Sequence, residues 1–190
     1  MLDENSAAYR WHKMAQQRKP TEEKQAFELA LSQSLNALAQ VEHFTDQEPY
    51  LLEFLASCYA NNFWRTHRSY KDTIPGHFAC RVRNRNNAFE AAWHHNWYMS
   101  ENQMAQRHNK KYRVRSTHIR KGKGFRYPKG RFSKANKEWE SDLIDYTEDG
   151  FALVREIRHE ILAIKKKAQT CTKRLHKLHK HFKKMEVLHD

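Results

Sequence analysis

The chain of 190 residues carries 35 Lys and Arg against 22 Asp and Glu, a formal net charge of +13, and its mean hydropathy is −1.01. This length suits one buried core with a helical extension and is short for two independent domains. Aromatic residues make up 12% of the chain, too many for an intrinsically disordered protein. Its three scattered cysteines predict neither a zinc cluster nor a disulfide framework.

Membrane insertion and export are also disfavoured. No uncharged stretch of about 18 residues is present, and the amino-terminal segment lacks the apolar run of a signal peptide. We therefore expect a protein that stays in the cytoplasm and has no contact with a membrane.

The charge is concentrated in the middle of the sequence. Residues 61–137 carry 19 Lys and Arg against 3 Asp and Glu, whereas residues 1–60 carry 5 against 9. Residues 138–160 carry 2 against 8, and residues 161–190 carry 9 against 2. A block this basic favours a polyanionic partner.

The first third of the chain has helical periodicity. A short helix is expected over residues 4–17, followed by an amphipathic helix over residues 21–44. The segment from Thr45 to Pro49 has the spacing of a capping box, with proline in the first turn of the helix that follows. A further helix over residues 47–65 is therefore predicted to form an antiparallel hairpin with the one before it.

The hydrophobic period then changes to two. Apolar and polar side chains alternate over residues 78–93 on both sides of an Asn-rich turn at 84–87, which predicts a β-hairpin. Residues 111–119 alternate in the same way. We therefore predict a three-stranded antiparallel meander, with residues 100–109 as a long connection before its third strand.

Helical periodicity returns after this region. Ser133 is placed to cap a helix that buries Trp139, Leu143 and Tyr146. Apolar residues then recur at alternating steps of three and four, which indicates more than four heptads of a coiled-coil seam. The seam consists of Val154, Ile157, Ile161, Ile164, Ala168, Cys171, Leu175, Leu178, Phe182 and Met185. The far end of so long a helix needs a partner, either the N-terminal helices or the same helix of a second copy.

Arginines alternate along the predicted strands. If the register allows, the arginines of the first and third strands share one face of the sheet, where they could reach phosphates and guanine edges in a major groove. These residues are Arg81, Arg83, Arg113 and Arg115. Like charges facing one another on a sheet are unfavourable without an external anion. The alternative is that arginine is merely tolerated at exposed strand positions.

The loop over residues 120–131 combines cations with glycines and aromatic rings. Glycines let a backbone approach phosphates, and Phe125 and Tyr127 could stack on bases. The alternative is a solvated loop whose rings fold back into the core. The complete set of candidate DNA-binding residues is Arg81, Arg83, Arg85, Arg113, Arg115, Arg120, Lys121, Lys123, Arg126, Tyr127, Lys129 and Arg131.

Other chemistries fit the sequence less well. The loop lacks the spacing of an ATP-binding P-loop. His94 and His95 are adjacent on a predicted strand and so face opposite sides, and His176 with His179 could share an ion but fit a solvated basic flank better. A two-metal nuclease needs several converging carboxylates, which the basic block does not contain. We expect no catalysis, no metal and no cofactor.

The acidic segment over residues 138–149 is expected on a helix beside the basic loop. One interpretation is a solvated helix start, where carboxylates are favoured by the helix dipole. The other is a docking surface for a basic protein partner. The sequence leaves both open.

The central part of the chain resembles the MobI family of conjugative-transfer proteins, which are encoded by plasmids and related integrative elements. The paired strands over 78–93 and the segments at 132–135 and 139–151 carry the resemblance, which covers about residues 78–165. The pattern I-x-K-G-x-G-x-R-Y-P at residues 119–128 is its most specific part. The resemblance implies an auxiliary mobilisation factor that recognises double-stranded DNA at the origin of transfer and helps a separate relaxase. The first 70 residues and those after 165 carry no part of it.

We therefore predict an α+β protein with a helical region over residues 1–70, a basic antiparallel sheet and glycine-rich loop over 71–132, and a helical or coiled-coil region over 133–190. Its predicted function is non-enzymatic binding of the origin of transfer in the bacterial cytoplasm, in support of a relaxase, with a homodimer allowed by the heptads. The alternatives are an RNA-binding or RNA-chaperone protein, and a coiled-coil interaction module without specific nucleic-acid binding.

Overall fold

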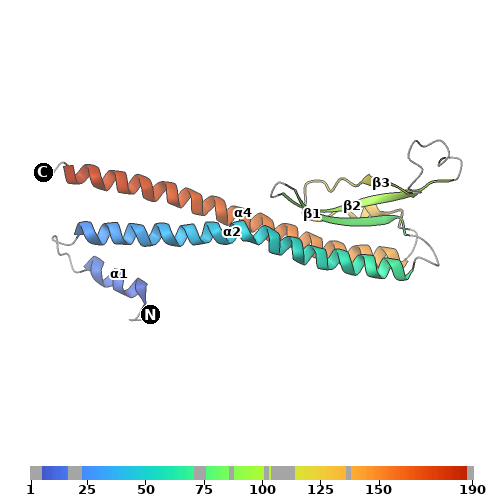
Figure 1. Cartoon of the computed structure of the whole chain (residues 1–190), viewed down its shortest axis with the longest axis horizontal. Helices are drawn as coiled ribbons and strands as arrows, with labels where there is room; N and C mark the ends of the chain where they lie inside the picture. The colour runs from blue at the N-terminus through green and yellow to red at the C-terminus, as the bar shows by residue number, and fades with distance from the viewer. Residues whose placement is uncertain are drawn as a thin grey trace. The chain divides into compact units, whose positions relative to one another are not determined.

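The computed structural model contains three α-helices, three strands and a 3-10 turn among the residues it describes (Figure 1). In chain order these are α1 (Ala7–Gln16), α2 (Glu23–Ser69), β1 (Phe78–Arg85), β2 (Ala88–Tyr98), β3 (Val114–His118), η2 (Lys129–Phe132) and α4 (Glu138–Val187). The described residues are 6–16, 23–70, 76–85, 88–100, 103, 114–135 and 138–187. The predicted α+β class is confirmed.

The chain divides into two compact units. Residues 46–162 form one, and residues 1–45 with 163–190 form the other, so α2 and α4 contribute to both. The predicted three-part division along the chain stays a prediction. None of the described helices has a stretch long and apolar enough to cross a membrane.

The first two strands form the predicted hairpin. β1 and β2 pair in antiparallel fashion from Phe78 opposite His95 to Arg85 opposite Ala88. The Asn-rich turn was predicted at residues 84–87, of which 86 and 87 lie outside the described part of the chain. Side chains alternate between the two faces of a strand. The pairing in this ladder therefore shows which face of the sheet each paired residue lies on.

β3 completes a sheet of order β1-β2-β3. It pairs with β2 from His94 opposite His118 to Tyr98 opposite Val114. The third predicted strand is thus confirmed for these residues. Its predicted first residues and most of the connection before it lie outside the described part.

One face of the sheet packs on α2 and α4 within the unit of residues 46–162. Phe63 of α2, Trp93 of β2 and Phe151 of α4 are completely buried there. The ring centroids of Phe63 and Trp93 are 5.2 Å apart, and those of Trp93 and Phe151 are 5.9 Å apart. The indole N–H of Trp64 donates to the carbonyl of Cys80 at 3.1 Å. Burial of each ring contributes about 1.5–3 kcal/mol to the stability of the fold, so this cluster is the centre of the core.

α2 continues through the segment where a break was predicted, so the hairpin of two helices is wrong at this point. Pro49 lies inside α2. The hydroxyl of Thr45 donates to the carbonyl of Glu42 at 2.8 Å and so bonds back into its own helix instead of capping a new one. Proline inside a helix costs about 3 kcal/mol. Burial of Leu52 and Ala56 just beyond it offsets that cost.

α4 is likewise one helix, and its buried stripe differs from the predicted one. Leu143 is buried as expected, but Tyr146 is 61% exposed. The stripe continues instead through Thr147 and Phe151, which follow Leu143 at four-residue steps, and Tyr146 falls beside it. Ser133, the predicted cap, instead follows η2 as its C-terminal cap residue.

Only one of the two heptad rows of α4 is covered. The covered row is buried or half-buried and consists of Val154, Ile161, Ala168, Leu175 and Phe182. The other row is exposed and consists of Ile157, Ile164, Cys171, Leu178 and Met185. In the unit of residues 1–45 and 163–190, Phe27 of α2 stacks on Phe182 at a centroid distance of 3.9 Å. α2 is therefore a partner for this end of α4.

Gly150 of α4 marks a close approach to α2. A Cβ atom at this position would lie 2.4 Å from the ring of Tyr59, so only glycine fits without displacing the ring. We expect Gly150→Leu to lower the free energy of unfolding by about 1–3 kcal/mol through overpacking. Urea denaturation followed by circular dichroism measures it. The control is Gly130→Leu, where the added Cβ would meet nothing within 4 Å. Equal stability of the two variants would contradict the close approach.

Candidate nucleic-acid interface

A buried carboxylate of α4 connects that helix to the sheet and to the glycine-rich loop. The side chain of Glu148 is 1% exposed. One of its oxygens accepts the indole N–H of Trp93 at 2.6 Å, and the other accepts the backbone N–H of Tyr127 at 2.8 Å and a guanidinium N–H of Arg155 at 2.8 Å. Its charge is therefore buried with both an ion-pair partner and neutral donors, which is the condition under which such burial is tolerated.

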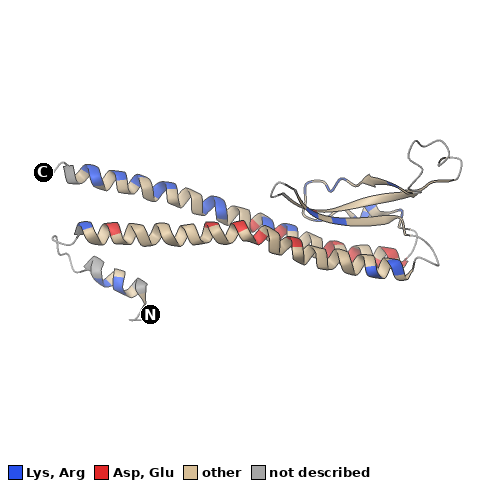
Figure 2. Ribbon diagram, in the orientation of Figure 1, with Lys and Arg blue, Asp and Glu red and all other residues tan. Residues whose placement is uncertain are grey.

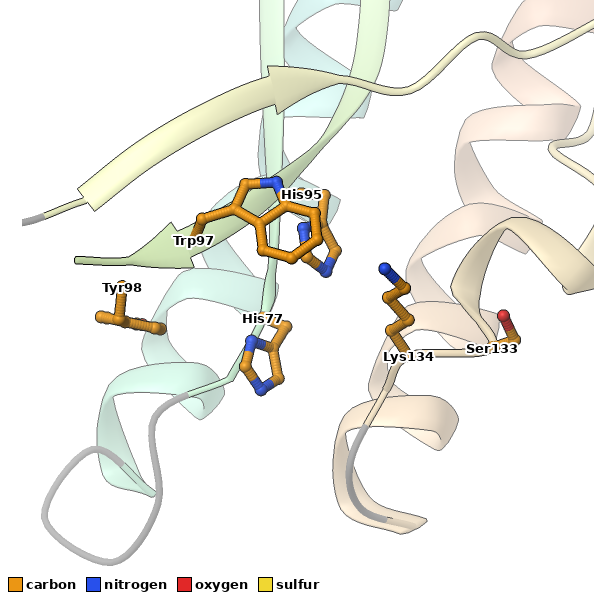
Figure 3. Close-up of a pocket in the computed structure, with 6 residues that line it drawn as sticks. All are labelled: His77, His95, Trp97, Tyr98, Ser133 and Lys134. Atoms are coloured by element: carbon orange, nitrogen blue, oxygen red, sulfur yellow. The ribbon is translucent and has the colours of Figure 1, made fainter. Parts of the chain in front are cut away.

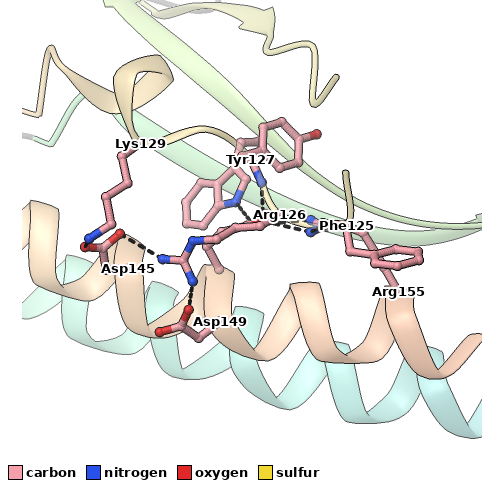
Figure 4. Close-up of polar contacts among 9 residues, drawn as sticks. Phe125, Arg126, Tyr127, Lys129, Asp145, Asp149 and Arg155 are labelled. Atoms are coloured by element: carbon pink, nitrogen blue, oxygen red, sulfur yellow. Dashed lines mark hydrogen bonds and ion pairs between the residues drawn. The ribbon is translucent and has the colours of Figure 1, made fainter. Parts of the chain in front are cut away.

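The guanidinium of Arg155 extends this network. Beyond its pair with Glu148, it donates to the carbonyl of Ala91 in β2 at 2.8 Å and to the carbonyl of Phe125 in the loop at 2.6 Å. Arg155 thus holds the loop against the sheet (Figure 4). Sequence reasoning missed this residue, although an Arg seven positions after a Glu on a helix lies on the same face two turns on.

A second buried carboxylate holds the start of the sheet. Glu140 is 1% exposed, and one of its oxygens accepts the backbone N–H of Phe78 at 2.9 Å. A Cβ at Gly76 would lie 2.5 Å from the same oxygen, so glycine permits this approach. Part of the acidic helix therefore serves neither as a solvated face nor as a docking surface, because it bonds the sheet.

The aromatic residues of the loop point to different environments. Tyr127 is 3% exposed, and burial raises the pKa of its phenol. A buried ring cannot stack on a base, so the prediction that the Tyr127 side chain contacts DNA is corrected. The alternative, a ring folded back into the core, holds for Tyr127. Phe125 is exposed, with its ring 5.3 Å from that of His159. Of the two rings that were expected to stack on bases, only Phe125 is exposed.

Two cations of the loop pair with the acidic helix. Arg126 donates to Asp145 at 3.1 Å and also forms an ion pair with Asp149. Lys129 donates to the other oxygen of Asp145 at 2.9 Å (Figure 4), and this bond lowers the pKa of the Asp145 carboxyl. Asp145 and Asp149 are four residues apart on one helix face, a spacing that sequence reasoning could have connected to the basic loop.

Arg81 and Arg83 lie on the face of the sheet that points away from the core. Their cross-strand partners in β2 are Ala92 and Glu90. Arg81 is exposed, whereas Arg83 donates to Glu90 at 2.5 Å and thereby lowers the pKa of that carboxyl. Glu90 thus supplies a counter-ion within the sheet, where an external anion was expected to be needed.

Arg115 lies on the opposite face of the sheet. Its cross-strand partner is Trp97, an odd-numbered residue of β2, whereas Arg81 and Arg83 face even-numbered ones. Directly opposed residues share a face, so the predicted common surface of strand arginines is wrong for Arg115. Arg113 and the side chain of Arg85 lie outside the described part of the chain.

Two histidines that the sequence did not assign lie on the same face as Arg81. His94 is opposite Ala79 in β1 and His118 in β3, and the two imidazole centroids are 5.4 Å apart. Burial, with the nearby His118 and Arg81, lowers the pKa of His94. His95 faces the other side, as predicted for the adjacent pair. This face therefore presents imidazole donors beside a guanidinium.

The cations of the candidate set fall into two groups. Arg83, Lys121, Arg126 and Lys129 bond to the chain itself, Lys121 through the carbonyl of Gly124. The second group forms no ion pair with any described residue, and its side chains are exposed. It consists of Arg81, Arg115, Arg120, Lys123 and Arg131. These can meet phosphates without breaking an internal contact.

Metal binding finds no support among the described residues. They contain no group of three or more His, Cys, Asp or Glu side chains arranged to hold an ion. His179, which could have shared an ion with His176, instead contacts a carboxylate oxygen of Glu28 at 2.8 Å.

These features define a basic α+β protein in which two helices support a small antiparallel sheet and a clamped, glycine-rich loop. A family model described as MobI protein matches residues 52–169, and the chain belongs to this family. The match starts within α2, earlier than the resemblance at 78–165, and includes the buried Leu52. Membership indicates a role in conjugative mobilisation. Searches of curated proteins and of solved structures find no match.

The Glu148 network makes a prediction about stability. Glu148→Gln leaves the guanidinium of Arg155 buried without a counter-ion, so we expect the free energy of unfolding to fall by about 3–5 kcal/mol. Urea denaturation measures this. Glu156→Gln, the same change at an exposed site of α4, is the control and should cost less than about 0.5 kcal/mol. A similar fall in the free energy of unfolding in both variants would show that the buried ion pair does not stabilise the protein more than an exposed carboxylate does.

Proposed function

We propose that this chain is an auxiliary DNA-binding factor of conjugative transfer, which recognises the origin of transfer and assists a separate relaxase in the bacterial cytoplasm without cutting DNA itself. The observation that carries the proposal is the set of exposed cations that form no ion pair among the described residues, in a member of the MobI family. Phosphate contacts of this kind supply most of the affinity of a protein for DNA.

The internally paired cations support the same function indirectly. Arg126 and Lys129 are held by Asp145, and Arg155 bonds the loop backbone at Phe125. These contacts fix the loop, so that Lys123 and Arg120 project from a preorganised segment. A preorganised binding loop loses less conformational entropy when it meets its ligand.

The sheet offers the residues for reading bases. Arg81, His94 and His118 share its outer face, and a two- or three-stranded sheet can enter a major groove with such side chains. Arg81 is the candidate for a bidentate contact with guanine, and the histidines are candidates for contacts with phosphates.

The helices offer a surface for the relaxase. Phe54, Tyr146 and Leu153 are each more than half exposed, on the segments of α2 and α4 in the unit of residues 46–162. Exposed carboxylates, among them Asp142 and Glu156, lie on the same segment of α4 (Figure 2). Apolar side chains with a polar rim are typical of protein interfaces, and the negative rim suits a basic partner.

We also infer that the protein forms a homodimer through α4. The exposed heptad row that contains Ile164 and Leu178 has the spacing of a coiled-coil seam, and α2 already covers the other row. An identical row from a second copy matches this spacing residue for residue.

Binding to a duplex that carries the origin of transfer tests the DNA-binding part. If six to eight phosphates are neutralised, affinity falls as roughly the fifth to seventh power of the salt concentration. We expect Lys123→Ala to weaken binding several-fold and to reduce the salt slope by about 1, because one phosphate contact is lost. The measurement is fluorescence anisotropy at several salt concentrations.

The matched control is Lys13→Ala, which removes one exposed cation of α1 outside the basic block and should leave affinity unchanged. A salt slope near zero for the unaltered chain would remove the electrostatic basis of the proposal. The assisting role is tested in the same system, by the nicking rate of the relaxase with and without this chain.

The dimer is tested by light scattering at micromolar concentration. Leu178→Glu places a charge in the exposed row and should convert the dimer to a monomer. Leu29→Glu is the control, because Leu29 is equally exposed on α2 in the same unit. A monomer for the unaltered chain, or dimers for both variants, would refute this interface.

A further inference from the structure

A cavity lies at the end of β2, in the unit of residues 46–162. Its volume is about 470 Å³, and it is lined by His77, His95, Trp97, Tyr98, Ser133 and Lys134 (Figure 3). This volume falls in the range of roughly 300–1,000 Å³ that small-molecule sites occupy. The lining is mostly aromatic, with one cation and one hydroxyl, and no residue of it belongs to the proposed duplex-binding face except Tyr98, at its edge.

The indole of Trp97 is the main apolar surface of the cavity. It is 47% exposed, and the Nζ atom of Lys134 lies 4.6 Å from its centroid. The ring of His95 packs against the indole at 4.3 Å, and the ring of His77 lies parallel to that of His95 at 5.8 Å. The imidazole of His95 thus meets the indole in an edge arrangement, and about half of the Trp97 surface stays exposed to a ligand.

A second cation adjoins the indole. Arg115 of β3 is directly opposite Trp97 in the ladder, on the same face of the sheet. It is exposed and forms no ion pair with any described residue. Two positive charges, one from β3 and one from the segment that follows η2, therefore lie near one aromatic platform.

The polar capacity of His95 is not used within the described part of the chain. Both ring nitrogens are shielded from solvent and have no hydrogen-bond partner among the described residues. Burial lowers the pKa of this imidazole, so the neutral ring offers one donor and one acceptor. Buried polar atoms are nearly always bonded, so an imidazole without a partner beside a cavity is unusual.

We propose that this pocket binds an unpaired base of single-stranded DNA, with the base stacked on Trp97 and its phosphate held by Arg115 and Lys134. Stacking on aromatic rings combined with cations along the backbone is the general chemistry of single-strand binding. A base inside a duplex cannot present its face to the indole, so the pocket discriminates opened from paired DNA. This inference rests on the proposed DNA-binding function and adds a second mode on the other face of the sheet.

The test compares an oligothymidylate of about 12 nucleotides, a length typical of single-strand sites, with a hairpin in fluorescence anisotropy. The two strands of the hairpin are joined by a non-nucleotide linker, so that every base in it is paired. Trp97→Ala should weaken oligothymidylate binding about tenfold, the effect of losing one stacked base, and change hairpin binding less than about twofold. Trp97→Phe keeps a ring and should stay within about threefold of the unaltered chain. Tyr50→Ala removes an exposed aromatic ring of α2 and is the matched control.

Two further variants test the cations of the pocket with substitutions that should leave the fold intact. Lys134→Ala and Arg115→Ala change exposed side chains and should each weaken oligothymidylate binding several-fold. Thermal melting by circular dichroism confirms that each variant is folded. Oligothymidylate should quench tryptophan emission in the unaltered chain, and the quenching should disappear in Trp97→Phe.

The outcomes separate this inference from the proposed function. Hairpin binding without oligothymidylate binding overturns the pocket alone. No binding to either DNA overturns both proposals. The pocket is also overturned if Trp97→Ala leaves oligothymidylate binding unchanged. Equal losses of oligothymidylate and hairpin binding in Trp97→Ala overturn it as well.

Discussion

The ion pair between Glu148 and Arg155 is the interaction on which the arrangement of the sheet and the glycine-rich loop depends. It lies between α4, β2 and the glycine-rich loop, and each partner bonds both of the other elements. The carboxylate accepts from Trp93 in β2 and from Tyr127 in the loop, and the guanidinium donates to the carbonyls of Ala91 in β2 and Phe125 in the loop. Two buried charges are tolerated only when their hydrogen bonds are satisfied. The position of the loop is therefore the condition under which the pair can be buried.

This constraint explains how the central positive charge is divided. Arg126 and Lys129 of the loop form ion pairs with Asp145 and Asp149 of α4, so their charge is neutralised within the molecule. Cations that project elsewhere, such as Arg120 and Lys123, form no ion pair among the described residues and are available to an external polyanion. The acidic helix thus acts as an internal counter-ion for the loop, and other carboxylates of the same helix, such as Asp142 and Glu156, are exposed.

The sheet gives the protein two chemically different faces. Arg81, His94 and His118 gather on the outer face, whereas Trp97 and Arg115 gather beside the cavity on the other. The proposed duplex and single-strand binding modes each use one of these faces. α4 adds a third surface, because one of its heptad rows is covered by α2 and the other is exposed.

The sequence by itself determined the α+β class, the hairpin at residues 78–93, the long terminal helix and the MobI family, because local periodicity and a short motif report these directly. Tertiary structure decided the rest. Pro49 lies inside a helix because burial of Leu52 and Ala56 just beyond it offsets its local cost, and Tyr127 is buried where Glu148 bonds its backbone. Arg115 lies on the other face from the one predicted. The register of strand pairing decides the face of each side chain, and contacts between distant strands set that register.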